Sequence, residues 1–238
     1  MSYRDKFYSK YASAHAANLY GSEADGEAQY SAWDWYFGEF LPEDKSAEIL
    51  DAGCGQGGFV KYLYDRDFKN SKGIDISPEQ VAAAKKQGIR GVELGNLSEF
   101  LPKNKNKYDL IFARDVLEHF SKNEALGFAE DVFGSLKAGG AFVIQTVNAE
   151  NLLWGRLRHG DFTHELAFTK ESVGQLLRVA GFKDISVFSQ RPVPHGIVSA
   201  ARAGLWMIFE YFLRAYLLVE TGSGKGIFTQ NLIVSAKK

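Results

Sequence analysis

Short apolar runs alternate with amphipathic stretches between residues 48 and 146. Strand-length runs separated by helical patterns are typical of βαβ units in a largely parallel sheet. The expected strands span 48–52, 72–76, 91–94, 108–113 and 141–146, and the expected helices span 59–66, 78–87 and 123–136. Ser77 and Pro78 are suited to the N-cap and the first turn of the second of these helices. This part of the chain therefore predicts an open α/β sheet.

The two ends of the chain differ from this central pattern. Residues 1–44 carry many aromatic side chains and no strand signal, so we expect a helical lid packed over one end of the sheet. Residues 45–238 are expected to form the main domain. Beyond the fifth strand, the pattern predicts a helix over 169–180 and two final strands over 183–189 and 227–236. The final strands are separated by an apolar helical insert at 197–220.

The insert carries few charges. Arg202, Glu210 and Arg214 project within an arc of about 120° at 100° per residue, and apolar side chains share that arc. These charges make a membrane-spanning helix unfavourable. The pattern suits a buried contact or a membrane surface better than a free solvent face. Peripheral contact with a bacterial inner membrane, a homodimer interface and a cover over the active site are the three alternatives for the insert.

Composition narrows the classes of function. The net charge is −1 over 238 residues, and we find no arginine-rich run, so no nucleic-acid partner is expected. The single cysteine, Cys54, excludes an internal disulfide, and the opening residues MSYRDKFYSK show no apolar leader. We therefore expect a cytoplasmic protein.

The stretch EILDAGCGQGGFV, residues 48–60, fits two glycine patterns. One is the dinucleotide fingerprint G-x-G-x-x-G, and the other is D-x-G-x-G-x-G, which begins at Asp51. In either pattern Asp75, at the end of the second strand, is placed to bind a ribose. Asp51 would lie unfavourably near an anionic pyrophosphate, but it suits a cofactor that carries an ammonium group and a sulfonium. The loop therefore favours S-adenosylmethionine over a nicotinamide cofactor.

Three motifs in order extend this interpretation. LDAGCGQG, YDLIFARDVLEHF and LKAGGAFVI resemble the motifs of class I S-adenosylmethionine-dependent methyltransferases, and the resemblance covers about residues 45–190. It implies a Rossmann-like seven-stranded sheet. It also implies a cofactor-binding set made of Asp51, Gly53, Gly55, Gln56, Gly57, Asp75, Ile76, Asn96, Leu97 and Arg114. Asn96 stands where the family often has an acidic residue, and its amide oxygen can accept one hydrogen bond from the adenine amine. Its alternative role is that of a turn-forming residue.

Two stretches supply candidates for the acceptor side. His119 closes DVLEHF just after the fourth strand, at the sheet edge where ligands of open α/β folds bind. RHGDFTHELAF, with Asp161 and His164, resembles the D-x-T-H stretch of methyltransferases in bacterial surface-glycan assembly, such as O-antigen and capsule synthesis. We assign catalytic roles to His119, Asp161 and His164. Asp161 and His164 could form a base with its orienting carboxylate or supply two ligands of a divalent metal, and we assign no metal. A helix-start role for His119 and a loop locked by Asp161 remain the structural alternatives.

The resemblance implies polysaccharide biosynthesis: O-methylation of a sugar hydroxyl in a bacterial surface polysaccharide or its precursor. Three alternatives stay open. One is a small-molecule O-methyltransferase that acts on a quinone precursor or a lipid-like phenol. The second is a non-catalytic cofactor-binding subunit that holds a partner enzyme, and the third is a nicotinamide oxidoreductase.

Overall fold

The computed structural model describes residues 3–14 and 26–238. Within them lies one seven-stranded sheet with the strand order β3-β2-β1-β4-β5-β7-β6. β7 is antiparallel to both of its neighbours, and the strands from β3 to β5 are parallel. The strands are β1 (Ile49–Ala52), β2 (Ser71–Asp75), β3 (Val92–Leu94), β4 (Tyr108–Arg114), β5 (Leu136–Val147), β6 (Lys183–Ser189) and β7 (Asn231–Lys237). This arrangement confirms the predicted Rossmann-like sheet.

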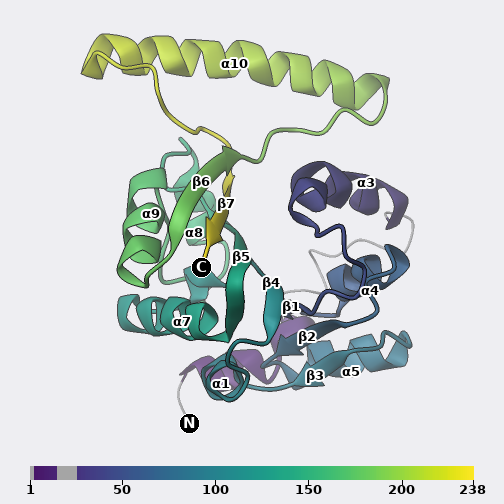
Figure 1. Cartoon of the computed structure of the whole chain (residues 1–238). Coiled ribbons are helices and arrows are strands. Elements are labelled where there is room, and N and C mark those ends of the chain that lie inside the picture. Colours follow the sequence, from purple (N-terminus) through teal and green to yellow (C-terminus); the bar gives the residue numbers. More distant parts are fainter. Residues whose placement is uncertain (1–2, 15–25) are drawn as a thin grey trace.

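Helices cover both faces of the sheet (Figure 1). Side chains alternate along each strand, so in β4 Leu110 and Phe112 join one apolar cluster while Ile111 and Ala113 join the other. The first cluster includes residues of α3 (Gly26–Phe37) and α4 (Gly58–Asp65), and α5 (Pro78–Lys86) packs near α4. The second includes α7 (Lys122–Ser135) and α9 (Lys170–Val179), with the short helix α6 (Leu97–Phe100) at its edge. The core therefore lies on both faces of β1 and β4, and the glycine loop follows the carboxyl end of β1.

Capping residues mark the starts of α5 and α7, close to the positions that the sequence predicts. The Ser77 hydroxyl accepts from the Gln80 amide at the start of α5, with Pro78 in its first turn. Ser121 and Glu124 form a capping box at the start of α7. Two strand boundaries differ from expectation by more than one residue. β5 begins at Leu136, because Leu136 pairs with Tyr108 ahead of a register shift. β7 begins at Asn231, because the carbonyls at Ile227 and Thr229 bond the Asn148 side chain instead of the ladder.

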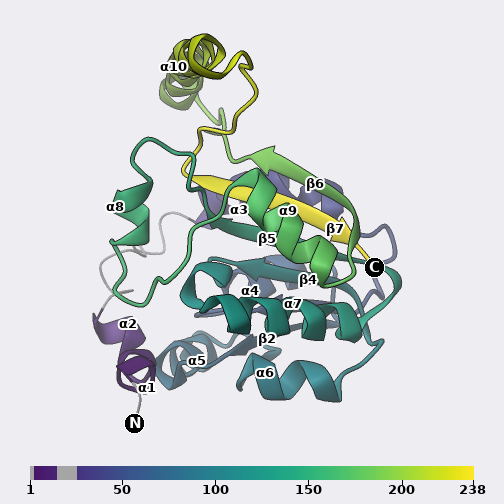
Figure 2. The ribbon, with the colours of Figure 1, turned by 90° about the vertical axis from the view of Figure 1, so that its left-hand side faces the viewer.

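The remaining helices gather beyond one end of the sheet. Figure 2 shows α1 (Tyr3–Tyr8), α2 (Tyr11–Ala14), α8 (Trp154–Arg158) and α10 (Ile197–Thr221) on the side toward which β6 points. β6 runs parallel to β5, because both are antiparallel to β7. The carboxyl ends of β1, β2 and β4 therefore share this side. The predicted lid is helical in its described part, and residues 1–2 and 15–25 of it lie outside the described residues. Among the described helices, none has both the length and the apolar character needed to cross a bilayer.

Candidate active site

The turn between β1 and α4 contains three glycines with positive φ. Gly53, Gly55 and Gly57 have φ angles of 78°, 55° and 78°, a region that glycine adopts without steric cost. A Cβ at Gly53 would meet Val116 Cγ2 at 2.4 Å, and one at Gly57 would meet Val92 Cγ2 at 2.7 Å. A Cβ at Gly55 would meet nothing within 4 Å. The outer two glycines thus allow close packing, whereas Gly55 faces open space in which a ligand could lie against the backbone.

Asp51 lies buried at the end of β1. Neither of its carboxylate oxygens accepts a hydrogen bond from the described residues, and its nearest cation is Arg114, with Nη2 at 3.5 Å from Oδ2. Burial raises the pKa of Asp51, and the positive charge of Arg114 opposes that rise. The Arg114 guanidinium lies 4.1 Å from the Phe59 ring centroid. A buried carboxylate without hydrogen bonds fits a cationic ligand group at this place.

Asp75 follows at the end of β2. Its Oδ2 accepts from the Gly55 amide at 2.8 Å, and its Oδ1 accepts from the Ser77 amide at 2.8 Å. Burial raises the pKa of this carboxyl, and the two amides oppose the rise. Each oxygen has a second lone pair, so the carboxylate can also accept from two hydroxyls of a ribose. Ile76, next along the chain, is 47% exposed, which suits an apolar contact with a flat ring.

The other predicted cofactor contacts have local partners. The Asn96 Oδ1 caps α6, accepting from the Ser98 amide at 3.1 Å and from its hydroxyl at 2.9 Å. These bonds use both lone pairs, so the geometry is that of the turn-forming alternative, and the adenine contact stays a prediction. Leu97 packs half-buried against the core, and the Gln56 Oε1 accepts from Gln87 Nε2 at 3.4 Å.

His119, Thr163 and Asp161 form a chain of hydrogen bonds on the acceptor side. The Thr163 hydroxyl donates to Asp161 Oδ1 at 2.7 Å, and His119 Nδ1 lies 2.8 Å from the same hydroxyl oxygen. Because the hydroxyl has one proton, His119 Nδ1–H must donate to it, which places the imidazole lone pair on Nε2. Burial alone would raise the pKa of Asp161. Hydrogen bonds from Tyr11 and Thr163 outweigh this effect and lower the pKa to about 2.

His164 lies beside this chain. Its Nδ1 is 3.0 Å from the Leu157 carbonyl oxygen, so Nδ1–H donates and Nε2 again carries the lone pair. Burial lowers the pKa of His164 and keeps the ring neutral near pH 7. The ring centroids of His119 and His164 are 4.6 Å apart. The structure thus brings together the three predicted catalytic residues, which come from two segments of the chain.

The same three side chains are a chemically suitable set of metal ligands. One donor atom each from His119, Asp161 and His164 lies within 4.8 Å of the other two. Two imidazoles and one carboxylate suit a divalent transition metal such as zinc. This arrangement allows either a base or a metal ligand set.

Glu118 belongs to the same region, although it is not among the residues predicted from the sequence. It is 1% exposed, and its Oε2 accepts from the Thr146 hydroxyl at 2.8 Å. Burial, together with the nearby charge of Asp115, raises its pKa to about 8. Its backbone carbonyl accepts from the Glu165 amide at 2.7 Å, which fixes the loop after Asp161 against the end of β4. The sequence feature that could have identified Glu118 is its position next to His119 in DVLEHF.

Helices α1 and α2 close one side of this region. Tyr11, on α2, donates to Asp161 Oδ2 at 2.6 Å. Arg4, on α1, contacts Glu165 and donates to Glu124 at 2.6 Å. The Phe7 and Phe162 rings stack with their centroids 5.1 Å apart. These contacts place aromatic side chains of the lid against the loop that carries Asp161 and His164.

Comparison with known proteins decides the family. A family model described as a methyltransferase domain matches residues 27–187, about two thirds of the chain. The chain belongs to this methyltransferase family. The match includes the glycine loop, Asp75 and His119.

Relatives of this methyltransferase act on different substrates. It is 29% identical to phosphoethanolamine N-methyltransferase 1 of Arabidopsis thaliana over 58% of the chain and 29% of the relative. It is 26% identical to the tRNA U34 carboxymethyltransferase of Hahella chejuensis over 81% of the chain and 61% of the relative. The methyltransferase therefore spans less than two thirds of the length of each of these two relatives.

Solved structures share the fold. A SAM-dependent methyltransferase from Archaeoglobus fulgidus aligns over all of both chains, with a TM-score of 0.67 and 19% identity. Phosphoethanolamine N-methyltransferase 2 of Haemonchus contortus, in complex with S-adenosylhomocysteine, aligns over 97% of this chain and 60% of its own, with a TM-score of 0.62 and 18% identity. The predicted cofactor, S-adenosylmethionine, is confirmed for this family of domains. The contacts made by individual residues stay predictions.

Proposed function

We propose that this methyltransferase transfers a methyl group from S-adenosylmethionine to a sugar hydroxyl of a bacterial surface polysaccharide or its precursor. When bound, the cofactor supplies an electrophilic methyl group on a sulfonium. The Asp75 carboxylate would accept from the ribose hydroxyls, Gly55 would allow the backbone to approach, and Asp51 would face the cationic end. The acceptor hydroxyl would be presented from the side of His119 and His164.

The chain Asp161–Thr163–His119 supports an alcohol as the acceptor. A sugar hydroxyl has a pKa far above neutral, so its attack on a methyl group is aided by a base that removes its proton. In this chain His119 Nδ1–H points toward Thr163, and Thr163 donates to an Asp161 carboxylate whose pKa is about 2. Proton uptake at His119 Nε2 would create a positive charge that this carboxylate stabilises through the hydroxyl. An imidazole held in this tautomer can serve as the base.

His164 supports the same assignment from a second position. Its ring is neutral near pH 7, and its Nδ1–H is engaged with a backbone carbonyl. Its lone pair on Nε2 can orient the acceptor hydroxyl or remove its proton.

A phenolic small molecule is the second candidate acceptor. The rings of Tyr8 and Tyr11 lie beside His119, and aromatic rings of this kind would pack against a phenol. A phenol, with a pKa of about 10, needs a weaker base than a sugar hydroxyl does. Methylation of a sugar hydroxyl should therefore depend more strongly on His119 than methylation of a phenol.

The test measures S-adenosylhomocysteine release with a panel of nucleotide sugars, lipid-linked oligosaccharides and phenols. With a sugar acceptor, His119→Ala and His164→Ala should each lower kcat by about 100-fold, in the range for loss of a general base. Calorimetric titration with S-adenosylhomocysteine should show unchanged cofactor affinity in both variants. The proposal is wrong if only phenols are methylated, or if both variants keep full activity on a sugar.

A further inference from the structure

Helix α10 stands apart from the rest of the molecule (Figure 1). It has 25 residues, which corresponds to about 37 Å at 1.5 Å per residue. Ser199 and Glu210 are its buried residues. A helix of this length with so little burial leaves most of its side chains without a packing partner in the described chain.

The charged side chains in the middle of α10 turn toward the body of the protein. Glu210 accepts from Arg191 Nη2 at 2.8 Å and from Arg214 Nη2 at 2.6 Å. Arg214 also donates to the Gly224 carbonyl at 2.9 Å. These bonds tie the helix to both connecting segments and fix which side of it faces outward.

The outward side is apolar and broad. Its large side chains, each more than half exposed, are Ile197, Val198, Leu205, Ile208, Phe209, Tyr211, Phe212, Tyr216, Leu218 and Val219. At 100° per residue, these positions spread over about 180° of the helix surface. No charged residue falls inside that arc, and Arg202 and Glu220 lie at one border of it. About half of the helix surface is therefore apolar and exposed.

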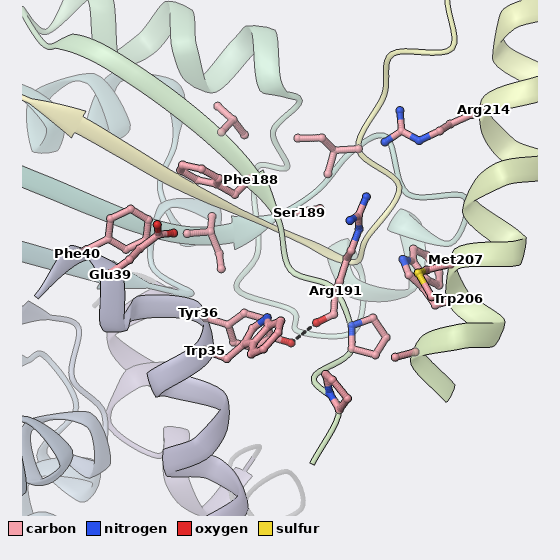
Figure 3. A pocket seen from close by; sticks show the side chains of 16 residues that line it. Trp35, Tyr36, Glu39, Phe40, Phe188, Ser189, Arg191, Trp206, Met207 and Arg214 are labelled. Carbon is pink, nitrogen blue, oxygen red and sulfur yellow. Dashed lines mark hydrogen bonds between the residues drawn. The ribbon is translucent and has the colours of Figure 1, made fainter. Parts of the chain in front are cut away.

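On the side of the helix that faces the body, the described residues leave a cavity of about 630 Å³ between α10, α3 and β6. Figure 3 shows Trp206 and Met207 of α10 on one side of it and Trp35 and Tyr36 of α3 on another. The Tyr36 hydroxyl donates to the Arg191 carbonyl, which links α3 to the segment that leads into α10. The helix is thus supported near Arg191 and Gly224 rather than packed along its length.

The width of the apolar arc favours a lipid surface over a second copy of the chain. Pairing with one other helix covers a stripe of roughly 100°, about half of this arc. An interfacial helix buries a broad apolar face in the boundary between headgroups and acyl chains, with polar groups on its other side. Here the other side is formed by the Arg191–Glu210–Arg214 contacts.

Local charge points the same way. Residues 190–226 contain four basic and two acidic side chains, a net charge of +2, whereas the whole chain has −1. Arg191 and Arg214 are paired with Glu210, and Arg202 and Lys225 are the other two basic side chains. Basic side chains beside an apolar face are attracted to anionic headgroups. We infer that α10 is a membrane-docking helix that lies in the surface of an anionic bilayer. It leaves β6 and returns to β7 on the side of the sheet that carries the candidate active site (Figure 2), so docking would hold that side near the lipid.

The test is cosedimentation of the full chain with vesicles of phosphatidylcholine alone and of phosphatidylcholine mixed with phosphatidylglycerol. It needs no methyl transfer, so its result is independent of the proposed acceptor. We expect binding to the mixed vesicles and at least tenfold weaker binding to phosphatidylcholine alone. The double variant Ile208→Glu and Phe212→Glu, at the centre of the arc, should bind the mixed vesicles at least tenfold less than the wild type. Val179→Glu, at a 65% exposed apolar position on α9, is the matched control and should bind like the wild type.

Titration with S-adenosylhomocysteine verifies that each variant is folded. The inference is overturned if the wild type stays in the supernatant with mixed vesicles, or if the double variant binds as the wild type does. It is also overturned if light scattering shows a dimer that the double variant converts to monomer while neither protein binds vesicles, because the occupant of the face would then be a second copy.

Discussion

The side chain of Glu118 lies where ionisation of a carboxyl group is unfavourable in free energy. It is buried beside Thr146, and the negative charge of Asp115 adds to the cost of ionisation. The pKa of about 8 means that the folded protein holds a proton here at neutral pH. In the unfolded chain the pKa returns to about 4.5, and the proton is released. A proton bound only in the folded state links stability to pH.

The sign of this linkage gives a prediction for Glu118→Gln. Because the folded-state pKa is raised, the contribution of Glu118 is fully present below pH 4.5 and is lost as the pH rises toward 8. Glutamine keeps the shape and can still accept from Thr146, but it has no proton to lose. We expect the variant to be more stable than the wild type at pH 8, by at least about 1 kcal/mol, since one pKa unit corresponds to about 1.36 kcal/mol. The difference should be much smaller at pH 5 and should vanish below pH 4.5.

Urea unfolding of both proteins at pH 5 and pH 8 measures this difference. A variant that is less stable than the wild type at pH 8 would show that Glu118 is ionised in the folded protein.

Individual side chains differ in how far the sequence predicts them. Asp51 and Asp75 follow from their position at strand ends, because parallel strands bring their carboxyl ends to one edge. The pairing of His119 with Thr163 does not follow, because 44 residues separate them and the contact depends on how the loop after β5 folds back. Asn96 is the opposite case. The family resemblance assigns its side-chain oxygen to the adenine amine, but this oxygen accepts a local hydrogen bond at the start of α6.

At the scale of elements, α1 is the part of the lid that is joined to α7 and to the loop after Asp161 by polar contacts. Arg4 donates to both Glu124 oxygens on α7, at 2.6 and 2.7 Å, and it also contacts Glu165. Glu124 is itself the N3 residue of the capping box of α7. One guanidinium therefore joins the lid to a helix start and to the loop that carries His164.

Arg4→Ala should loosen α1 without unfolding the domain. The carboxylates that it contacts are partly exposed, so the expected loss of stability is about 1 kcal/mol or less. Hydrogen exchange should become faster at the α1 amides, and the KM for the acceptor should rise while kcat changes less. Lys6→Ala, an exposed basic residue of the same helix, is the control. Unchanged exchange at α1 in the Arg4 variant would show that the other contacts of the lid hold α1 in place without Arg4.

On the scale of the whole molecule, the sheet and its two apolar clusters form one unit, and α10 is an addition to it. The positions of the strands along the chain follow from hydrophobic patterning, because the central strands β1, β4 and β5 carry side chains of both apolar clusters. The sequence also predicts the insert and places its charges on one arc. It does not predict that this arc turns inward, because that depends on Arg191 and Gly224, which lie outside the helix.

Because α10 is separate from the core, we predict that the core still folds when α10 is removed. In a variant with residues 196–222 replaced by a short Gly/Ser linker, β6 and β7 keep their partners, because α10 contributes no residue to either large apolar cluster. We expect affinity for S-adenosylhomocysteine within about twofold of the wild type, a change below about 0.5 kcal/mol. We also expect the far-ultraviolet circular dichroism to lose the signal of one long helix. Solubility should improve, because a large exposed apolar surface is removed. If the shortened chain fails to fold or loses cofactor binding, α10 is part of the core, and its outward face has a structural partner within the chain.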